Sequence, residues 1–152
     1  MAANSRFAIA VHVMTMMAWA GDEPLKSEQV ACSVNTNPVV IRRILCALQR
    51  ERLVVSQTGA TGGSRLARKP GQITLLDIYR AVDAGDLFSL HRQPPNEECP
   101  VGMNIEPVLE DVLAEVGQSI ERVLAKITIE KVLQAIEPRT TSTLRRGRKA
   151  GS

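Results

Sequence analysis

The stretch from residue 37 to residue 66, NPVVIRRILCALQRERLVVSQTGATGGSRL, decides the fold. It opens on Asn37, a preferred N-cap, followed by Pro38, whose missing N–H costs nothing in the first turn of a helix. Four aliphatic residues then follow at the i, i+3, i+4, i+7 spacing of a buried helical stripe, namely Ile41, Ile44, Leu45 and Leu48. The sequence therefore predicts an amphipathic helix that begins at Pro38.

The opposite face of this helix is cationic and carries no acid. At 100° per residue it presents Val39, Arg43, Cys46 and Arg50, with Arg42 and Gln49 on one flank. A second short helix precedes it, from an expected N-cap at Ser27 to a left-handed Asn35. Two such helices joined by residues 33–36 fit a helix-turn-helix, although an ordinary solvated helix face would give the same pattern.

A β-hairpin is predicted directly after the second of these helices. Residues 53–68 read as two strands around the glycine-rich loop 58–63. We expect an apolar packed side and a cationic side, with Leu53, Val55 and Leu66 on the first and Arg65 and Arg68 on the second. The loop lacks the GK[ST] ending of a phosphate-binding P-loop, so its glycines would instead let the backbone lie close to a sugar-phosphate chain. A helix-turn-helix followed by a basic hairpin is a winged helix.

In these elements the chain resembles the IscR/NsrR/CymR (Rrf-type) family of winged-helix transcriptional regulators. The resemblance extends to Ile73-Thr74-Leu75-Leu76-Asp77-Ile78 and Ala81-Val82-Asp83, and it covers roughly residues 1–136. It implies a mainly α fold with a small β-hairpin wing, in which a winged helix-turn-helix domain precedes a long C-terminal dimerisation helix. Members of the family are dimeric DNA-binding repressors or activators, and the resemblance implies the same activity here.

The DNA contacts are expected on the outer face of the second helix and in the hairpin. Arg42 or Arg43 would read base edges in the major groove, Asn37 would hold a phosphate, and Arg65 would enter or flank the minor groove. The full expected set is Asn37, Val39, Arg42, Arg43, Arg50, Thr58, Gly62, Gly63, Ser64 and Arg65.

Residues 7–20 are nearly continuous apolar sequence, and a helix is expected over residues 5–20, ended by Gly21. Its end resembles a signal-peptidase site, but the run is too short to span a bilayer and contains His12 and Thr15. We therefore expect a first helix that is buried nearly all round, with His12 as a core residue, and no membrane contact.

After the hairpin, Thr74 and Asp77 form an N-capping arrangement for a fourth helix, and Ile73 can pack against Ile78 across its first turn. A Pro-rich loop from Asp86 to Gly102 follows. Apolar residues then recur at spacings of three and four positions over more than twenty residues. A helix of this length is longer than a small winged helix needs to cover its own core. We expect this stripe to pair with a second copy, through Ile105, Leu109, Val112, Leu113, Val116, Ile120, Val123, Leu124 and Ile127. The alternative is that the stripe only covers the core of its own domain.

The resulting organisation is a winged-helix domain over 1–84, a loop over 85–103, dimerisation helices over 104–137 and a basic tail over 138–152 that we expect to be disordered. A short closing helix is expected over 129–136, ended by Pro138. The last fourteen residues hold five basic and no acidic side chains, whereas residues 42–69 hold seven basic residues and one acid. A basic middle region of this kind is typical of a surface that binds a polyanion.

The three cysteines show no CxxC spacing, so a reducing, cytoplasmic setting is expected. Relatives that bind iron–sulfur clusters carry three cysteines in the loop before the dimerisation helix, where this chain has Cys99 alone, so no cofactor is expected. A cluster with His91 as a further ligand is the less favoured alternative. Cys46, beside cationic residues, and Cys99 are candidate sensors, although the acids before Cys99 should disfavour a thiolate; Cys32 is expected in the core.

No HExxH, GxSxG or GxGxxG motif is present, so the sequence does not indicate an enzyme. With 3% aromatic residues among 152, a surface that stacks single-stranded bases is also disfavoured. We expect the chain to be a homodimeric, sequence-specific transcriptional repressor. Its expected partner is a near-palindromic operator in double-stranded DNA. The alternative is a helical protein–protein adaptor that has kept the winged helix without DNA binding.

Overall fold

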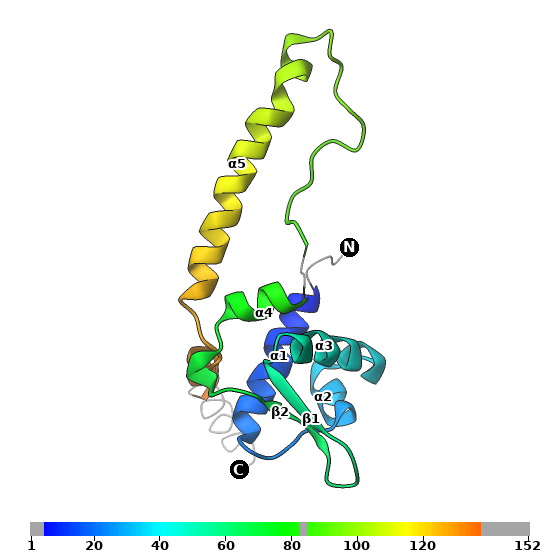
Figure 1. Ribbon diagram of the computed structural model, residues 1–152, viewed down its shortest axis with the longest axis vertical. Helices are drawn as coiled ribbons and strands as arrows, with labels where there is room; N and C mark the ends of the chain where they lie inside the picture. The colour runs from blue at the N-terminus through cyan, green and yellow to red at the C-terminus, as the bar shows by residue number, and fades with distance from the viewer. Residues whose placement is uncertain (1–4, 83–84, 138–152) are drawn as a thin grey trace, which may run out of the picture.

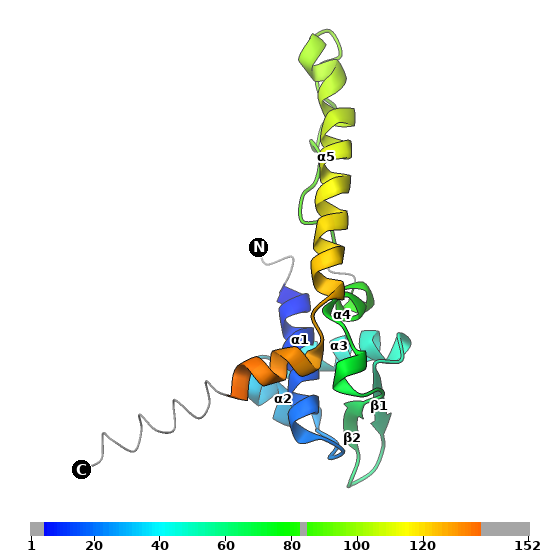
Figure 2. The same ribbon diagram turned by 90° about the vertical axis from the view of Figure 1, so that its left-hand side faces the viewer.

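The computed structural model describes residues 5–82 and 85–137, and it places the helix-turn-helix and the hairpin beside one long projecting helix (Figures 1 and 2). The elements in chain order are α1 (Ser5–Ala20), α2 (Ser27–Val34), α3 (Pro38–Arg50), β1 (Val54–Gln57), β2 (Gly63–Leu66), the 3₁₀ turn η1 (Pro70–Gln72), α4 (Leu75–Val82) and α5 (Pro100–Ala125). Residues 129–137 are also helical. The expectation of a mainly helical fold with a two-stranded wing is confirmed.

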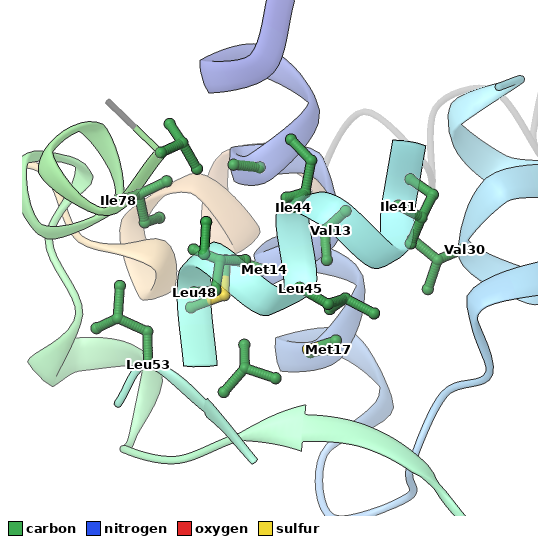
Figure 3. Close-up of a cluster of buried hydrophobic side chains, with 14 of the residues drawn as sticks. Val13, Met14, Met17, Val30, Ile41, Ile44, Leu45, Leu48, Leu53 and Ile78 are labelled. Carbon is green, nitrogen blue, oxygen red and sulfur yellow. The ribbon is translucent and has the colours of Figure 1, made fainter. Parts of the chain in front are cut away.

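The predicted stripe of α3 is the centre of the core. Ile41, Ile44 and Leu48 are fully buried, and they pack with side chains of α1, α2 and α4 (Figure 3). Close packing of these aliphatic groups fixes the orientation of α3, because turning the helix would expose the stripe. The opposite face of α3 is thereby held toward solvent.

The turn between α2 and α3 has the predicted chemistry. Asn35 adopts the left-handed conformation, with φ 60° and ψ 52°, and the Asn37 Oδ1 accepts a hydrogen bond of 2.8 Å from the backbone N–H of Val39. The expected N-cap at Ser27 is wrong, since Lys26 is the cap residue and its N–H donates to the Gln29 Oε1 at 2.8 Å. A glutamine in the first turn supplies this acceptor from within the helix.

The hairpin has the predicted strands in a different phase. Val54 pairs with Leu66 and is 2% exposed, whereas Val55 pairs with Arg65 and is 37% exposed. Val55 was expected on the packed side of the hairpin. Because successive side chains point to opposite faces of a strand, Val55 instead lies on the cationic side, and Val54 is the residue that enters the core.

Burial of α1 nearly all round is also wrong. Ala10, Val13, Met14 and Met17 are buried on the side that faces α3 and α4, but the other side is open and Trp19 is 61% exposed. His12, expected in the core, is exposed and its Nε2 lies 2.9 Å from the Ser33 Oγ of α2.

The predicted capping of α4 is confirmed, and it forms part of a junction with the end of α5. The N–H of Thr74 donates to the Asp77 carboxylate at 2.9 Å, and the N–H of Asp77 donates to the Thr74 hydroxyl at 3.1 Å. The N–H of Leu75 donates to the Ile127 carbonyl at 2.8 Å, and the N–H of Ile129 donates to the Ile73 carbonyl at 3.0 Å. These bonds anchor the base of α5, and they place Ile127 in the junction beyond the end of the helix.

Helix α5 begins at Pro100, three residues before the expected end of the loop, because a proline fits the first helical turn. None of its residues is buried. Pro138 and the basic tail lie outside the described residues. No helix in the described ranges is long and apolar enough to cross a membrane.

Candidate nucleic-acid interface

The outer face of α3 is the most strongly cationic surface that the prediction identified. Val39, Arg43, Cys46 and Arg50 are all exposed, as helical phase predicts, and the exposed Asn37 caps the N-terminus of the helix. No acid of α3 lies on this face, so its potential is positive. An exposed helix of this kind fits the width of the major groove of double-stranded DNA.

Arg42, on the flank of this face, is paired with a residue that sequence reasoning missed. Its Nη2 donates to the Glu28 Oε1 of α2 at 2.9 Å, and both side chains are largely exposed. A backbone N–H at the start of α2 and the charge of Arg42 lower the pKa of Glu28 below its usual value. Exposed pairs contribute little to stability, so Arg42 can exchange Glu28 for another acceptor at small cost. No local motif signals this pair, because its partners are fourteen residues apart on two helices.

The wing presents Arg65 beside Val55 on its outer side, and Thr58 is exposed at the start of the loop. Arg68 follows β2, and its guanidinium donates a weak bond of 3.5 Å to the Glu51 carbonyl at the end of α3. The wing cations therefore extend the positive surface of α3 along the hairpin.

The wing glycines serve the hairpin itself. A Cβ at Gly62 would lie 2.3 Å from the Gln57 carbonyl oxygen, and one at Gly63 would lie 2.7 Å from the Leu25 carbonyl oxygen. Neither position accepts a larger residue without moving backbone atoms. These contacts explain both glycines without a sugar-phosphate partner.

Ser64 is likewise committed inside the hairpin. It is 5% exposed, and its Oγ lies 2.7 Å from the Ser56 Oγ. Its backbone exchanges two hydrogen bonds with Leu25, at 2.9 and 2.8 Å. Its side chain is therefore unavailable to DNA in this conformation. Of the other expected side chains, Arg65 is half-buried, and Asn37, Val39, Arg42, Arg43, Arg50 and Thr58 are exposed.

The cysteines depart from two expectations. Cys46 is exposed on the α3 face as predicted, but Cys32 is exposed rather than in the core, because it lies on the outer side of the short α2. Cys99 occupies the N-cap position of α5, and the backbone N–H groups of Gly102 and Val101 lower the pKa of its thiol. The helix terminus thus outweighs the neighbouring acids, which were expected to disfavour a thiolate.

Among the described residues, potential metal ligands are not clustered. In the ranges 5–82 and 85–137, no three His, Cys, Asp or Glu side chains are grouped so as to hold a metal ion. The three cysteines lie on α2, on α3 and at the start of α5, which is the end of that helix remote from the winged helix (Figure 1).

Known proteins resemble this chain in sequence and in fold. The sequence pattern of the Rrf2 family, described as an iron-dependent transcriptional regulator, matches residues 3–135. YwnA of Bacillus subtilis, named as an HTH-type transcriptional regulator, is 39% identical over 131 residues, which cover 86% of this chain and 96% of YwnA. A crystal structure described as a DNA binding protein is 34% identical, with a TM-score of 0.68 over 84% of this chain and 98% of that chain. The structure of T. potens IscR is 25% identical, with a TM-score of 0.68 over 89% of this chain and 88% of that chain.

Proposed function

Because the chain belongs to the Rrf2 family of HTH transcriptional regulators, we propose that it is a dimeric repressor of a near-palindromic operator in double-stranded DNA. The observation that carries the proposal is the exposed, acid-free cationic face of α3, held outward by a fully buried stripe on its other side. A small dimer that covers one or two turns of DNA excludes other proteins from it, and this supports repression.

The proposed contacts follow from where each side chain lies. Arg42 or Arg43 pairs with guanine O6 and N7 in the major groove, where a guanidinium binds in a bidentate manner. Asn37 and the N-terminus of α3 face a phosphate, and Arg65 flanks the adjacent minor groove. Val39, Arg50 and Thr58 are the other exposed members of the proposed contact set. Gly62 and Gly63 shape the wing, and Ser64 supports it from inside.

The proposed dimer uses α5. Its exposed face carries a shallow apolar groove of about 470 Å³ that includes Val112, Val116, Ile120, Val123 and Leu124, all from the predicted stripe. Together with the exposed Val101, Met103 and Val108 of the same helix, this groove forms an apolar surface of the kind that marks protein–protein interaction sites. Pairing about a twofold axis places two winged helices side by side, with half-site centres about 34–36 Å apart or a multiple of that spacing.

The test is to capture genomic DNA fragments with the purified protein and to sequence the bound fragments. We expect enrichment of a short, near-palindromic sequence, and specific binding should exceed binding to unrelated DNA by about 10³-fold or more. If no sequence is enriched, the adaptor function is favoured instead.

We further propose that operator binding needs no iron–sulfur cluster, since the loop before α5 carries Cys99 alone where three cysteines are expected in cluster-binding relatives. Protein purified without oxygen is expected to contain less than one iron per dimer, and to bind the captured fragment with the same affinity before and after treatment with an iron chelator. Stoichiometric iron with visible absorbance, or a loss of affinity on chelation that iron and sulfide restore, would overturn this.

Cys46 is the better-placed candidate sensor, because a bulky adduct on its thiol would occupy the face of α3 that is proposed to enter the major groove.

A further inference from the structure

A pocket of about 520 Å³ lies between the open side of α1 and the helical residues 129–137. Figure 2 shows the helix of residues 129–137, in orange, next to α1, in blue. All but two of its lining residues are apolar: Ala8, Val11, His12, Thr15, Met16, Trp19, Ala20, Leu25, Val132, Leu133 and Ile136. The Thr15 hydroxyl donates to the Val11 carbonyl at 2.7 Å, and the His12 Nε2 lies 2.9 Å from the Ser33 Oγ. The second ring nitrogen of His12, Nδ1, is therefore the atom that a ligand's polar group would meet.

We propose that this pocket binds a small, largely apolar molecule with one hydrogen-bonding group, and that its occupancy regulates DNA binding. The second half of this statement rests on the proposed function. The volume is within the range of small-molecule sites, which combine apolar walls with few polar groups. Trp19 is 61% exposed on the pocket wall, so an apolar ligand would remove a large aromatic surface from water.

The chain itself offers no better occupant. Residues 138–152 contain one aliphatic side chain larger than alanine or proline, Leu144, among arginine, lysine, threonine, serine and glycine. Such a segment does not match apolar walls. The apolar stripe proposed for the second copy is on α5, and no residue of α5 lines this pocket. These two observations favour a small molecule over the tail or a partner subunit.

Two walls of the pocket are bonded directly to the proposed DNA-binding elements. The His12 Nε2 lies 2.9 Å from the Ser33 Oγ, at the end of α2 and two residues before the left-handed Asn35 of the turn. The N–H of Leu25 donates to the Ser64 carbonyl of the wing at 2.9 Å, and the N–H of Ser64 donates to the Leu25 carbonyl at 2.8 Å. A ligand that displaces His12 or Leu25 therefore changes the position of the turn or of the wing, and binding of DNA would in return change the affinity for the ligand.

Trp19 is the one tryptophan of the chain, so its fluorescence reports occupancy without a label. Octanoate and 1-octanol, which are transparent at its excitation wavelength, are suitable probes with a charged and a neutral polar group. We expect at least one of them to shift the Trp19 emission to shorter wavelength with saturation, because the ring leaves water. In Ala8→Phe, whose new ring fills the pocket from an exposed position, the dissociation constant should rise at least tenfold, and Ala20→Leu should act in the same direction.

Ser5→Phe is the matched control, since it adds the same ring to α1 outside the pocket. It should bind the probe like the wild type. A shift that is absent, unsaturable or equal in Ala8→Phe would overturn the site, and a shift on raising protein concentration without probe would assign the pocket to a second copy. This titration contains no DNA, so its failure leaves the proposed function standing.

A second experiment measures DNA binding with the captured fragment. A saturating concentration of the probe should change the apparent Kd for this DNA at least threefold in the wild type and not in Ala8→Phe. An unchanged Kd would overturn the regulatory role.

Discussion

Replacing Arg42, Arg43 and Arg65 together with alanine is expected to lower the affinity for the captured DNA fragment by about a hundredfold or more. Loss of a bidentate contact to guanine costs about 1–3 kcal/mol, and each lost phosphate contact also lowers the salt dependence of binding. Fluorescence anisotropy over a series of salt concentrations measures both effects. All three side chains are away from the core, so the free energy of unfolding should change little.

The control removes the same charge elsewhere. Arg6, Arg92 and Lys126 are exposed and distant in sequence from α3 and the wing, so their replacement with alanine separates a local contact from a change in net charge. The control variant should keep most of the wild-type affinity. Equal loss in the two variants would assign the effect to net charge alone, and undiminished affinity of the first variant would disprove the assigned interface.

The features that sequence predicts best here are those with a local cause. The α3 stripe repeats within one helix, the Asn37 cap acts two residues away, and the Thr74–Asp77 pair spans one turn. Each is fixed by the geometry of a single helical segment, so its pattern is present in the order of the residues. The outer face of α3 follows directly from its inner face.

The features that sequence reasoning missed depend on how separate elements pack. Val54 and Val55 are equally apolar, and which one enters the core is set by how the hairpin meets α3. The Arg42–Glu28 pair requires α2 and α3 to be docked. Trp19 is exposed because a pocket, rather than a packed element, lies over that side of α1. Local periodicity contains none of this information.

The structure also improves the design of a test for the proposed dimer. Leu113 and Ile120 lie at mid-stripe, but both line a cavity shared with residues 86–90 of the same chain, so a charge there would disturb the monomer as well. Val112 and Val123 are 50% and 58% exposed and, at 100° per residue, lie within about 20° of each other on α5. These two positions test association with least effect on the fold of one protomer.

The double variant Val112→Glu/Val123→Glu is therefore expected to be monomeric at micromolar concentration, where the wild type is expected to sediment as a dimer. Pairing two such chains would place four carboxylates in an apolar interface, and unpaired buried charges are too costly to be retained. Gln118→Glu/Ala125→Glu adds the same charge at exposed positions more than 90° away around α5, and it should remain dimeric. The monomer should also lose tight operator binding, because one half-site supplies only part of the phosphate and base contacts. A wild type that sediments as a monomer, or a monomeric variant that binds a single half-site as tightly as the wild type binds the whole operator, would contradict the proposed assembly.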